Sequence, residues 1–130
     1  MNTKLVMTTS SLFLGVIGAM LSFLPNEIAD YLSVQPNSIT MLFFMLMSSL
    51  YLGFGILNWT AKGTLIGGIY NRPIAIGNLM HFGVGAIALF KVASSIQSHS
   101  EIVISLAVAY GIFTILFLYI FRKNPTKTKN

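Results

Sequence analysis

The stretch Asn71–Val92, NRPIAIGNLMHFGVGAIALFKV, decides the fold that we predict for this chain. A helix needs about 20 apolar residues to cross the hydrocarbon core of a bilayer, and this stretch is long enough. Pro73 suits the first helical turn, and the proline keeps Arg72 out of the α region, so Arg72 is the expected N-cap. Asn78 and His81 lie inside the apolar run. No other stretch combines a titratable side chain within the membrane with so clear a helix start.

The composition of the whole chain is also typical of a membrane protein. Of its 130 residues, 55% are hydrophobic and 8% are charged, whereas soluble domains carry about 25% charged residues. The length allows one domain, and the absence of cysteine excludes disulfides, thiolate metal sites and cysteine nucleophiles. The net charge of +5 does not indicate nucleic-acid binding, because the basic residues follow the ends of apolar runs.

Four apolar stretches predict an all-α integral membrane protein, with four transmembrane helices in an up-down bundle and a short interfacial helix after the first span. The predicted spans cover residues 5–24, 39–59, 73–93 and 101–121. Pro25 ends the first span, and residues 25–34 predict the interfacial helix. Ser38 is the expected N-cap of the second span. Residues 1–121 then form a single four-span domain, and residues 122–130 form a basic cytoplasmic tail that we expect to be disordered.

The first and second spans each carry small or polar residues at a repeat that places them on one helix face. These residues are Thr8, Ser11, Gly15, Gly18 and Ser22 in the first span, and Ser48, Tyr51, Gly55, Asn58 and Lys62 in the second. The small residues of the first face let a neighbouring backbone come close. A cleaved signal peptide is the alternative for the first span, but its apolar run is long and no A-x-A-like cleavage site follows.

Basic residues gather on one side of the four-span arrangement. That side holds Lys4, Lys62, Arg72, Arg122, Lys123, Lys127 and Lys129. The other side holds Lys91 together with all three acids, Glu27, Asp30 and Glu101. Because cytoplasmic loops are enriched in Lys and Arg, both termini are expected in the cytoplasm, and a dual topology is disfavoured.

A polar pocket between the second and third spans is the candidate binding site. His81 lies about 12 Å from the cytoplasmic end of its helix, and Tyr51 lies about 12 Å from the same end of an antiparallel neighbour. Asn58 is expected near the level of Asn78, with Arg72 at the cytoplasmic mouth. Lipid cannot satisfy an amide or an imidazole, so these side chains should point into the bundle. Together the five residues would bind a small or lipid-like molecule.

Two roles remain open for these polar side chains. His81 could bind a ligand or move a proton, or it could donate a hydrogen bond to Ser48 or Tyr51 and fix the helix register only. Arg72 could be an anion ligand assisted by the helix N-terminus, or a charge that lies at the membrane interface. No catalytic residue and no cofactor is assigned, and an enzyme of lipid or quinone with His81 as general base is the third hypothesis.

No metal site is predicted either. Glu27 and Asp30 lie three residues apart on the outer side, but a metal needs more ligands than these two carboxylates supply. They would form a site only if His99 and Glu101 approached from the other outer loop. The expected alternative is a solvated, negatively charged rim.

The layout of the chain resembles one family. The size, the four spans, the break at Leu24-Pro25 and the N-R-P-I-A-I-G-N start of the third span at residues 71–78 look like small bacterial DoxX-like inner-membrane proteins. The resemblance implies a multi-pass protein of the cell inner membrane, and at most a membrane subunit that works near quinone or redox chemistry.

Two functions therefore remain from the sequence. The first is a small integral membrane protein that binds or transports a small or lipid-like molecule through the polar pocket. The alternative is a non-catalytic accessory or structural subunit, whose small-residue faces dock onto a larger membrane complex or onto its own copies. Its expected partners are membrane lipid, such a ligand, and further protein subunits or copies, but no nucleic acid.

Overall fold

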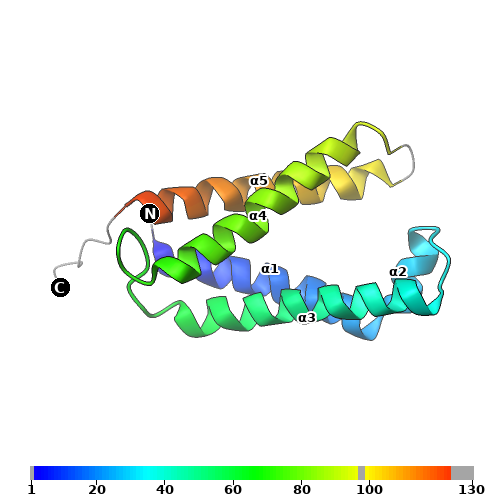
Figure 1. The fold of residues 1–130 in the computed structure, drawn as a ribbon, viewed down its shortest axis with the longest axis horizontal. Coiled ribbons are helices and arrows are strands. Elements are labelled where there is room, and N and C mark those ends of the chain that lie inside the picture. The colour runs from blue at the N-terminus through cyan, green and yellow to red at the C-terminus, as the bar shows by residue number, and fades with distance from the viewer. Residues whose placement is uncertain (1, 97–98, 124–130) are drawn as a thin grey trace. The chain divides into compact units, whose positions relative to one another are not determined.

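The computed structural model describes residues 2–96 and 99–123, which divide into two compact units, each a helical hairpin (Figure 1). The N-terminal hairpin, residues 2–62, contains α1 (Thr3–Phe23), α2 (Pro25–Tyr31) and α3 (Ser38–Ala61). The C-terminal hairpin begins at residue 63 and contains α4 (Arg72–Ala93) and α5 (Ser100–Arg122). The regular secondary structure of the described residues is entirely α-helical, as the sequence predicts. The predicted tail at residues 124–130 lies outside the described residues.

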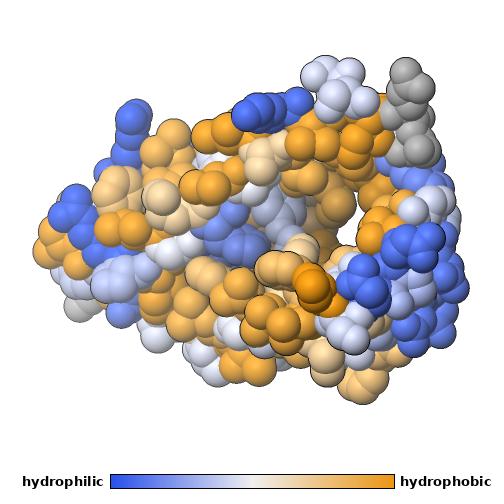
Figure 2. All heavy atoms as spheres, turned by 45° about the vertical axis from the view of Figure 1, so that its right-hand side comes forward, coloured by the Kyte–Doolittle hydropathy of each residue, from blue (hydrophilic) through white to orange (hydrophobic). Residues whose placement is uncertain are grey.

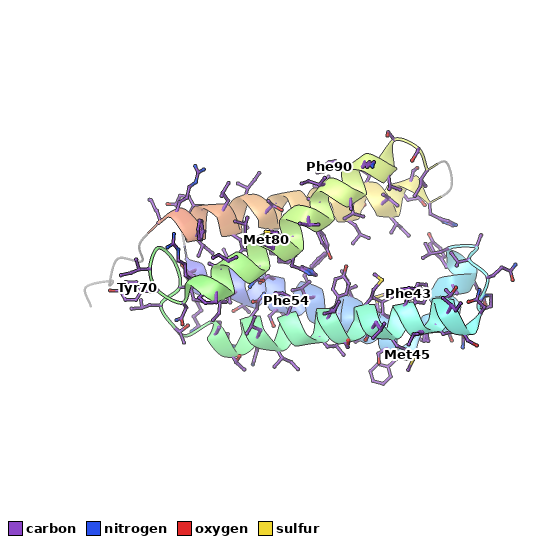
Figure 3. The ribbon with its side chains drawn as sticks, in the orientation of Figure 1. Phe43, Met45, Phe54, Tyr70, Met80 and Phe90 are labelled. Carbon is purple, nitrogen blue, oxygen red and sulfur yellow. The ribbon has the colours of Figure 1, made fainter. Side chains whose placement is uncertain are left out.

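Within the described residues, the four long helices α1, α3, α4 and α5 have the length and apolar composition needed to cross a membrane. Each overlaps a predicted span and differs from it by at most two residues at either end. Large apolar side chains are exposed along them, including Ile56 (65% exposed), Ile87 (71%) and Ile115 (69%). Apolar residues cover much of the face drawn in Figure 2, and Figure 3 shows exposed Met80 and Phe90 on α4. Such helix surfaces suit a hydrocarbon solvent better than water.

In the N-terminal hairpin, α1 and α3 run antiparallel and come into close contact through their small residues (Figure 1). The Ser11 hydroxyl donates to the Gly55 carbonyl oxygen over 2.7 Å. The Ser48 hydroxyl donates to the Gly18 carbonyl oxygen over 2.8 Å. A Cβ atom at Gly55 would lie 3.2 Å from the Gly15 nitrogen. The close backbone approach predicted for the first span is thus confirmed, and its partner is α3.

The turn after α1 ends its short helix earlier than the sequence predicts. The predicted helix covers residues 25–34, whereas α2 ends at Tyr31. Ser33 has a left-handed backbone with φ of 56°. Its N–H bonds to the Asp30 carbonyl, and the next N–H, of Val34, bonds to the Ala29 carbonyl. This is the Schellman pattern that ends many α-helices. It is hard to predict from this sequence, because its left-handed position is usually glycine and is here Ser33.

The two predicted N-caps are each wrong by one residue. Asn37, not Ser38, caps α3, because its Oδ1 accepts the N–H groups of Ile39 and Thr40. Asn71, not Arg72, precedes α4, and Arg72 is already helical. Asn37 takes its position because its side chain accepts backbone N–H groups. Asn71 takes its position because asparagine tolerates the positive φ found there.

The loop before α4 is held by Asn71. Its backbone is left-handed, with φ of 45°. Its side-chain amide donates to the Leu65 carbonyl oxygen over 2.7 Å and to the Thr64 hydroxyl over 3.3 Å. Gly67 and Tyr70 exchange backbone hydrogen bonds of 2.9 Å and complete the turn. These hydrogen bonds therefore fix the conformation of the loop and the direction in which α4 begins.

Candidate functional site

The candidate site lies in the C-terminal hairpin, where His81 of α4 meets Tyr110 of α5. The tyrosine Oη lies 3.3 Å from the histidine Nε2, and the tautomer of the imidazole decides which of them donates. The two ring centroids are 5.6 Å apart. Tyr110 is buried, whereas His81 is only half-buried. The phenol therefore contacts the imidazole at Nε2, and the histidine side chain as a whole is only partly enclosed.

Gly85 makes this contact possible. It lies one helical turn after His81, on the same face of α4. A Cβ atom at Gly85 would overlap the ring of Tyr110. The missing side chain thus lets the tyrosine ring lie flat against the α4 backbone and reach the imidazole. The sequence placed His81 and Gly85 on one face, and the structure identifies the ring that this face receives.

A cluster of aromatic rings packs beside the His81–Tyr110 pair, in the contact between α4 and α5. Phe82 is fully buried and stacks with Phe113 and Phe117 of α5 at centroid distances of 4.7 and 5.7 Å. Its ring also meets Tyr110 edge-on at 5.2 Å. Aromatic pairs in these arrangements add about 0.5–1.5 kcal/mol beyond the area they bury. The cluster therefore fixes the height and rotation of α4 against α5, and with them the geometry of the pair His81–Tyr110.

Asn78 and Arg72 occupy the same helix but differ from His81 in their surroundings. Asn78 is fully buried, and its side-chain amide donates to the Ile74 carbonyl oxygen one turn earlier, over 3.0 Å. Arg72 is exposed at the start of α4, and its guanidinium carbon lies 5.1 Å from the centroid of the Phe121 ring. This cation–π contact joins the ends of α4 and α5 and accords with the interface charge considered for Arg72.

Asn58 and Tyr51, the other two predicted site residues, lie on α3 in the N-terminal hairpin. Asn58 is fully buried, and its amide donates to the Ser10 hydroxyl of α1 over 3.0 Å. Tyr51 is half-buried. A common pocket of these residues with His81 would require residues from both hairpins, and it stays a prediction.

The sequence reasoning missed Tyr110, a hydrogen-bond partner of His81, and Ser10, a hydrogen-bond partner of Asn58. Tyr110 had a signal, since it is a polar aromatic residue in the middle of an apolar span. Ser10 had a weaker one, because it lies beside the small-residue face that includes Ser11. Helix periodicity shows which side chains share a face, but it does not show which neighbouring helix the face meets.

The polar side chains of the hairpins are matched to partners. Among the described residues, no buried side-chain nitrogen or oxygen lacks a hydrogen-bond partner. In the same part of the chain, no group of three or more His, Asp or Glu side chains is placed to hold a metal ion.

Comparisons with known proteins identify no relative. The chain matches no protein-family model, no curated protein and no solved structure. The DoxX-like resemblance therefore stays a prediction from the layout of the sequence.

Proposed function

We propose that this chain is a multi-pass membrane protein that binds a small or lipid-like molecule beside His81. The observation that carries the proposal is the half-buried imidazole at the middle of α4, bonded on one side to Tyr110. Ionisable side chains at this depth are costly in hydrocarbon, so they are retained mainly where they have a role. Asn78 and Asn58 are fully buried, whereas His81 is half-buried.

The proposed location is the inner membrane of a bacterium, with both termini in the cytoplasm. Within the described residues, Lys4, Lys62 and Arg72 lie at the helix ends assigned to the cytoplasm, as do Arg122 and Lys123. The acidic residues of α2 and the start of α5 lie at the opposite ends. The positive-inside rule favours this orientation.

The absence of cysteine gives a direct test of topology, because any introduced thiol is unique. Gly63→Cys places a thiol in the exposed loop after α3, where a Cβ meets nothing within 4 Å. Gln35→Cys places one in the exposed turn before α3. In intact cells, a membrane-impermeant maleimide should label Gln35→Cys and spare Gly63→Cys until the membrane is opened. The reverse pattern would refute the orientation.

Ligand binding is tested by native mass spectrometry of the full chain, released from detergent. We expect a small-molecule adduct on the wild-type protein that is lost in His81→Leu and kept in Val84→Leu. Val84 lies on the same helix and is 56% exposed, so it controls for substitution within α4. If every adduct of the wild-type protein survives His81→Leu, binding at the imidazole is refuted.

The second candidate function is an accessory subunit without a ligand of its own. It is favoured by the full pairing of buried polar groups in the described residues, which suits polar side chains that only fix helix packing. Under this reading, a subunit near quinone or redox chemistry is the expected setting. A wild-type chain without any adduct, purified together with another membrane protein, would support this candidate over the first.

A further inference from the structure

A groove runs along the outside of the N-terminal hairpin, where the close approach of α1 and α3 leaves space above their glycines. Its volume is about 460 Å³, within the range of about 300–1,000 Å³ that small-molecule sites occupy. It is lined by Ser11, Leu12, Gly15, Val16, Ala19, Leu52, Gly55, Ile56 and Trp59. All of these residues belong to one compact unit, so the groove is a property of that hairpin alone.

The lining selects hydrocarbon rather than a polar ligand. Ser11 brings a hydroxyl to the groove, and that hydroxyl already donates to the Gly55 carbonyl oxygen over 2.7 Å. Aliphatic side chains and glycine backbone form most of the remaining wall, with Trp59 near the end of α3. A flexible chain of methylene groups fits an open, apolar channel of this kind.

Two lysines lie at the Trp59 end of the groove. Lys62 places its Nζ 2.9 Å from the centroid of the Trp59 ring. The bonded pairs Ser10–Asn58 and Ser11–Gly55 set an antiparallel register, which places Lys4 of α1 level with Lys62. Lys4 also lies seven residues before Ser11 of the groove, on the same face of α1. Each of the two helices therefore carries a lysine at the level of the Trp59 end of the groove.

Charge within the hairpin is separated along its length. The acids of its described residues, Glu27 and Asp30, lie on α2, at the end of α1 remote from Lys4. An anion attracted to the hairpin is thus directed to Lys4 and Lys62. Tryptophan beside lysine at a helix end is also the pattern found at the level of lipid headgroups.

We propose that this groove binds one anionic phospholipid, with an acyl chain between α1 and α3 and the phosphate at Lys62 and Lys4. The proposal rests on the membrane insertion proposed above but not on ligand binding at His81. Basic residues beside a membrane attract anionic lipids electrostatically, and the apolar channel holds one chain in place.

The test uses the full chain in nanodiscs of zwitterionic phosphatidylcholine, with a small fraction of phosphatidylglycerol that carries a photoactivatable acyl chain. Irradiation should attach the probe to groove residues such as Leu12, Val16 and Ile56, located by mass spectrometry of peptides. A phosphatidylcholine probe with the same acyl chain should label these residues no more than exposed apolar residues elsewhere, such as Ile87. Equal labelling of the groove by both probes would overturn the choice of an anionic headgroup.

Two glycine variants separate filling of the groove from a general change in the helix. A Cβ at either Gly15 or Gly53 meets nothing within 4 Å, so both sites accept a larger side chain. Gly15 lines the groove, whereas Gly53 is exposed and does not. Gly15→Leu should abolish labelling by the anionic probe, and Gly53→Leu should keep it. Unchanged labelling of Gly15→Leu would overturn the proposal.

Lysine variants test binding of the anionic headgroup and leave the apolar wall of the groove unchanged. If Gly15→Leu does not fold, these variants by themselves test the proposal. Lys4→Gln and Lys62→Gln should each reduce labelling roughly fivefold. Lys91→Gln, which removes a charge from the C-terminal hairpin, should not. Full labelling of the Lys4→Gln/Lys62→Gln double variant contradicts the proposal.

Two further readouts keep the conclusions apart. Flotation of the chain with vesicles after carbonate washing tests membrane insertion, and its failure would remove the basis of both proposals. His81→Leu should leave the labelling unchanged, so a lost His81 ligand and a lost groove lipid are distinguishable. If the groove remains unlabelled and a bifunctional maleimide joins the Val16→Cys variant to a second copy, the occupant is another chain and the proposal is wrong.

Discussion

The ring of Tyr110 lies against the backbone of Gly85, with its hydroxyl 3.3 Å from Nε2 of His81. Three residues from two helices thus act as one structural unit. Glycine leaves the space, the tyrosine ring fills it, and the tyrosine hydroxyl and the histidine Nε2 share a hydrogen bond. This relationship makes the pairing of α4 with α5 specific, because no other residue at position 85 leaves room for the ring.

Gly85→Ala should therefore destabilise the C-terminal hairpin. The added methyl group overlaps the Tyr110 ring, and overpacking of this kind costs about 1–3 kcal/mol. The measurement is the free energy of unfolding in mixed micelles. Gly83→Ala is the control, because its Cβ would meet the Thr114 methyl at an ordinary 3.6 Å. Equal stability of the two variants would contradict the close contact.

Tyr110→Phe should keep the ring packing and remove the hydrogen bond to His81. Hydrogen bonds between membrane helices contribute about 0.6 kcal/mol on average and about 1.7 kcal/mol at most. A double-mutant cycle with His81→Leu should give a coupling energy in that range. The control is Tyr119→Phe, since Tyr119 lies on the same helix and is 40% exposed. A coupling energy of zero would show that the 3.3 Å contact contributes nothing to stability.

Ser11→Ala and Ser48→Ala should each loosen α1 from α3. Each variant removes a hydroxyl that donates to a backbone oxygen of the other helix. The expected loss is about 0.6 kcal/mol for each, measured as the free energy of unfolding. Ser49→Ala is the matched control, because the exposed Ser49 hydroxyl bonds to Leu46 of its own helix. A larger loss for Ser49→Ala than for Ser11→Ala would reverse the assignment of the interface.

Asn71→Ala should disturb the entry into α4. Alanine at the left-handed φ of 45° costs about 1–2 kcal/mol, and the amide bond to the Leu65 carbonyl is also lost. Asn71→Gly loses the same hydrogen bond but adopts the backbone without strain. Asn71→Gly should therefore be the more stable of the two by thermal unfolding. The opposite order would show that the left-handed backbone is not a constraint at this position.

The long helices were predictable because their signal is local and strong. An apolar run near 20 residues in length has few alternatives, and Pro25 and Pro73 mark where two helices begin. The caps were less predictable. Asn37 and Ser38 can both cap a helix, and only the observed bonds from the backbone to Asn37 distinguish them.

The candidate site was predictable only in part. The sequence indicated His81 and Asn78 as the polar residues of the third span, and both lie on α4 as expected. It offered Ser48 or Tyr51 as the structural partner of His81, whereas the hydrogen bond found within the C-terminal hairpin is made to Tyr110. Ser48 instead bonds to Gly18 of α1. A sequence pattern does not distinguish between side chains of equal polarity as partners of His81. Only the three-dimensional structure shows which of them is close enough to form the hydrogen bond.

The sequence by itself determined the number and length of the long helices and the small-residue face of α1, because apolar length and helical periodicity are properties of each segment alone. The tertiary structure decided which surfaces meet: α1 with α3 across Gly15 and Gly55, and α4 with α5 across Gly85 and Tyr110. Partner choice depends on the fit of ridges and gaps between two surfaces. That fit is a property of both helices together, so no single stretch of sequence contains it.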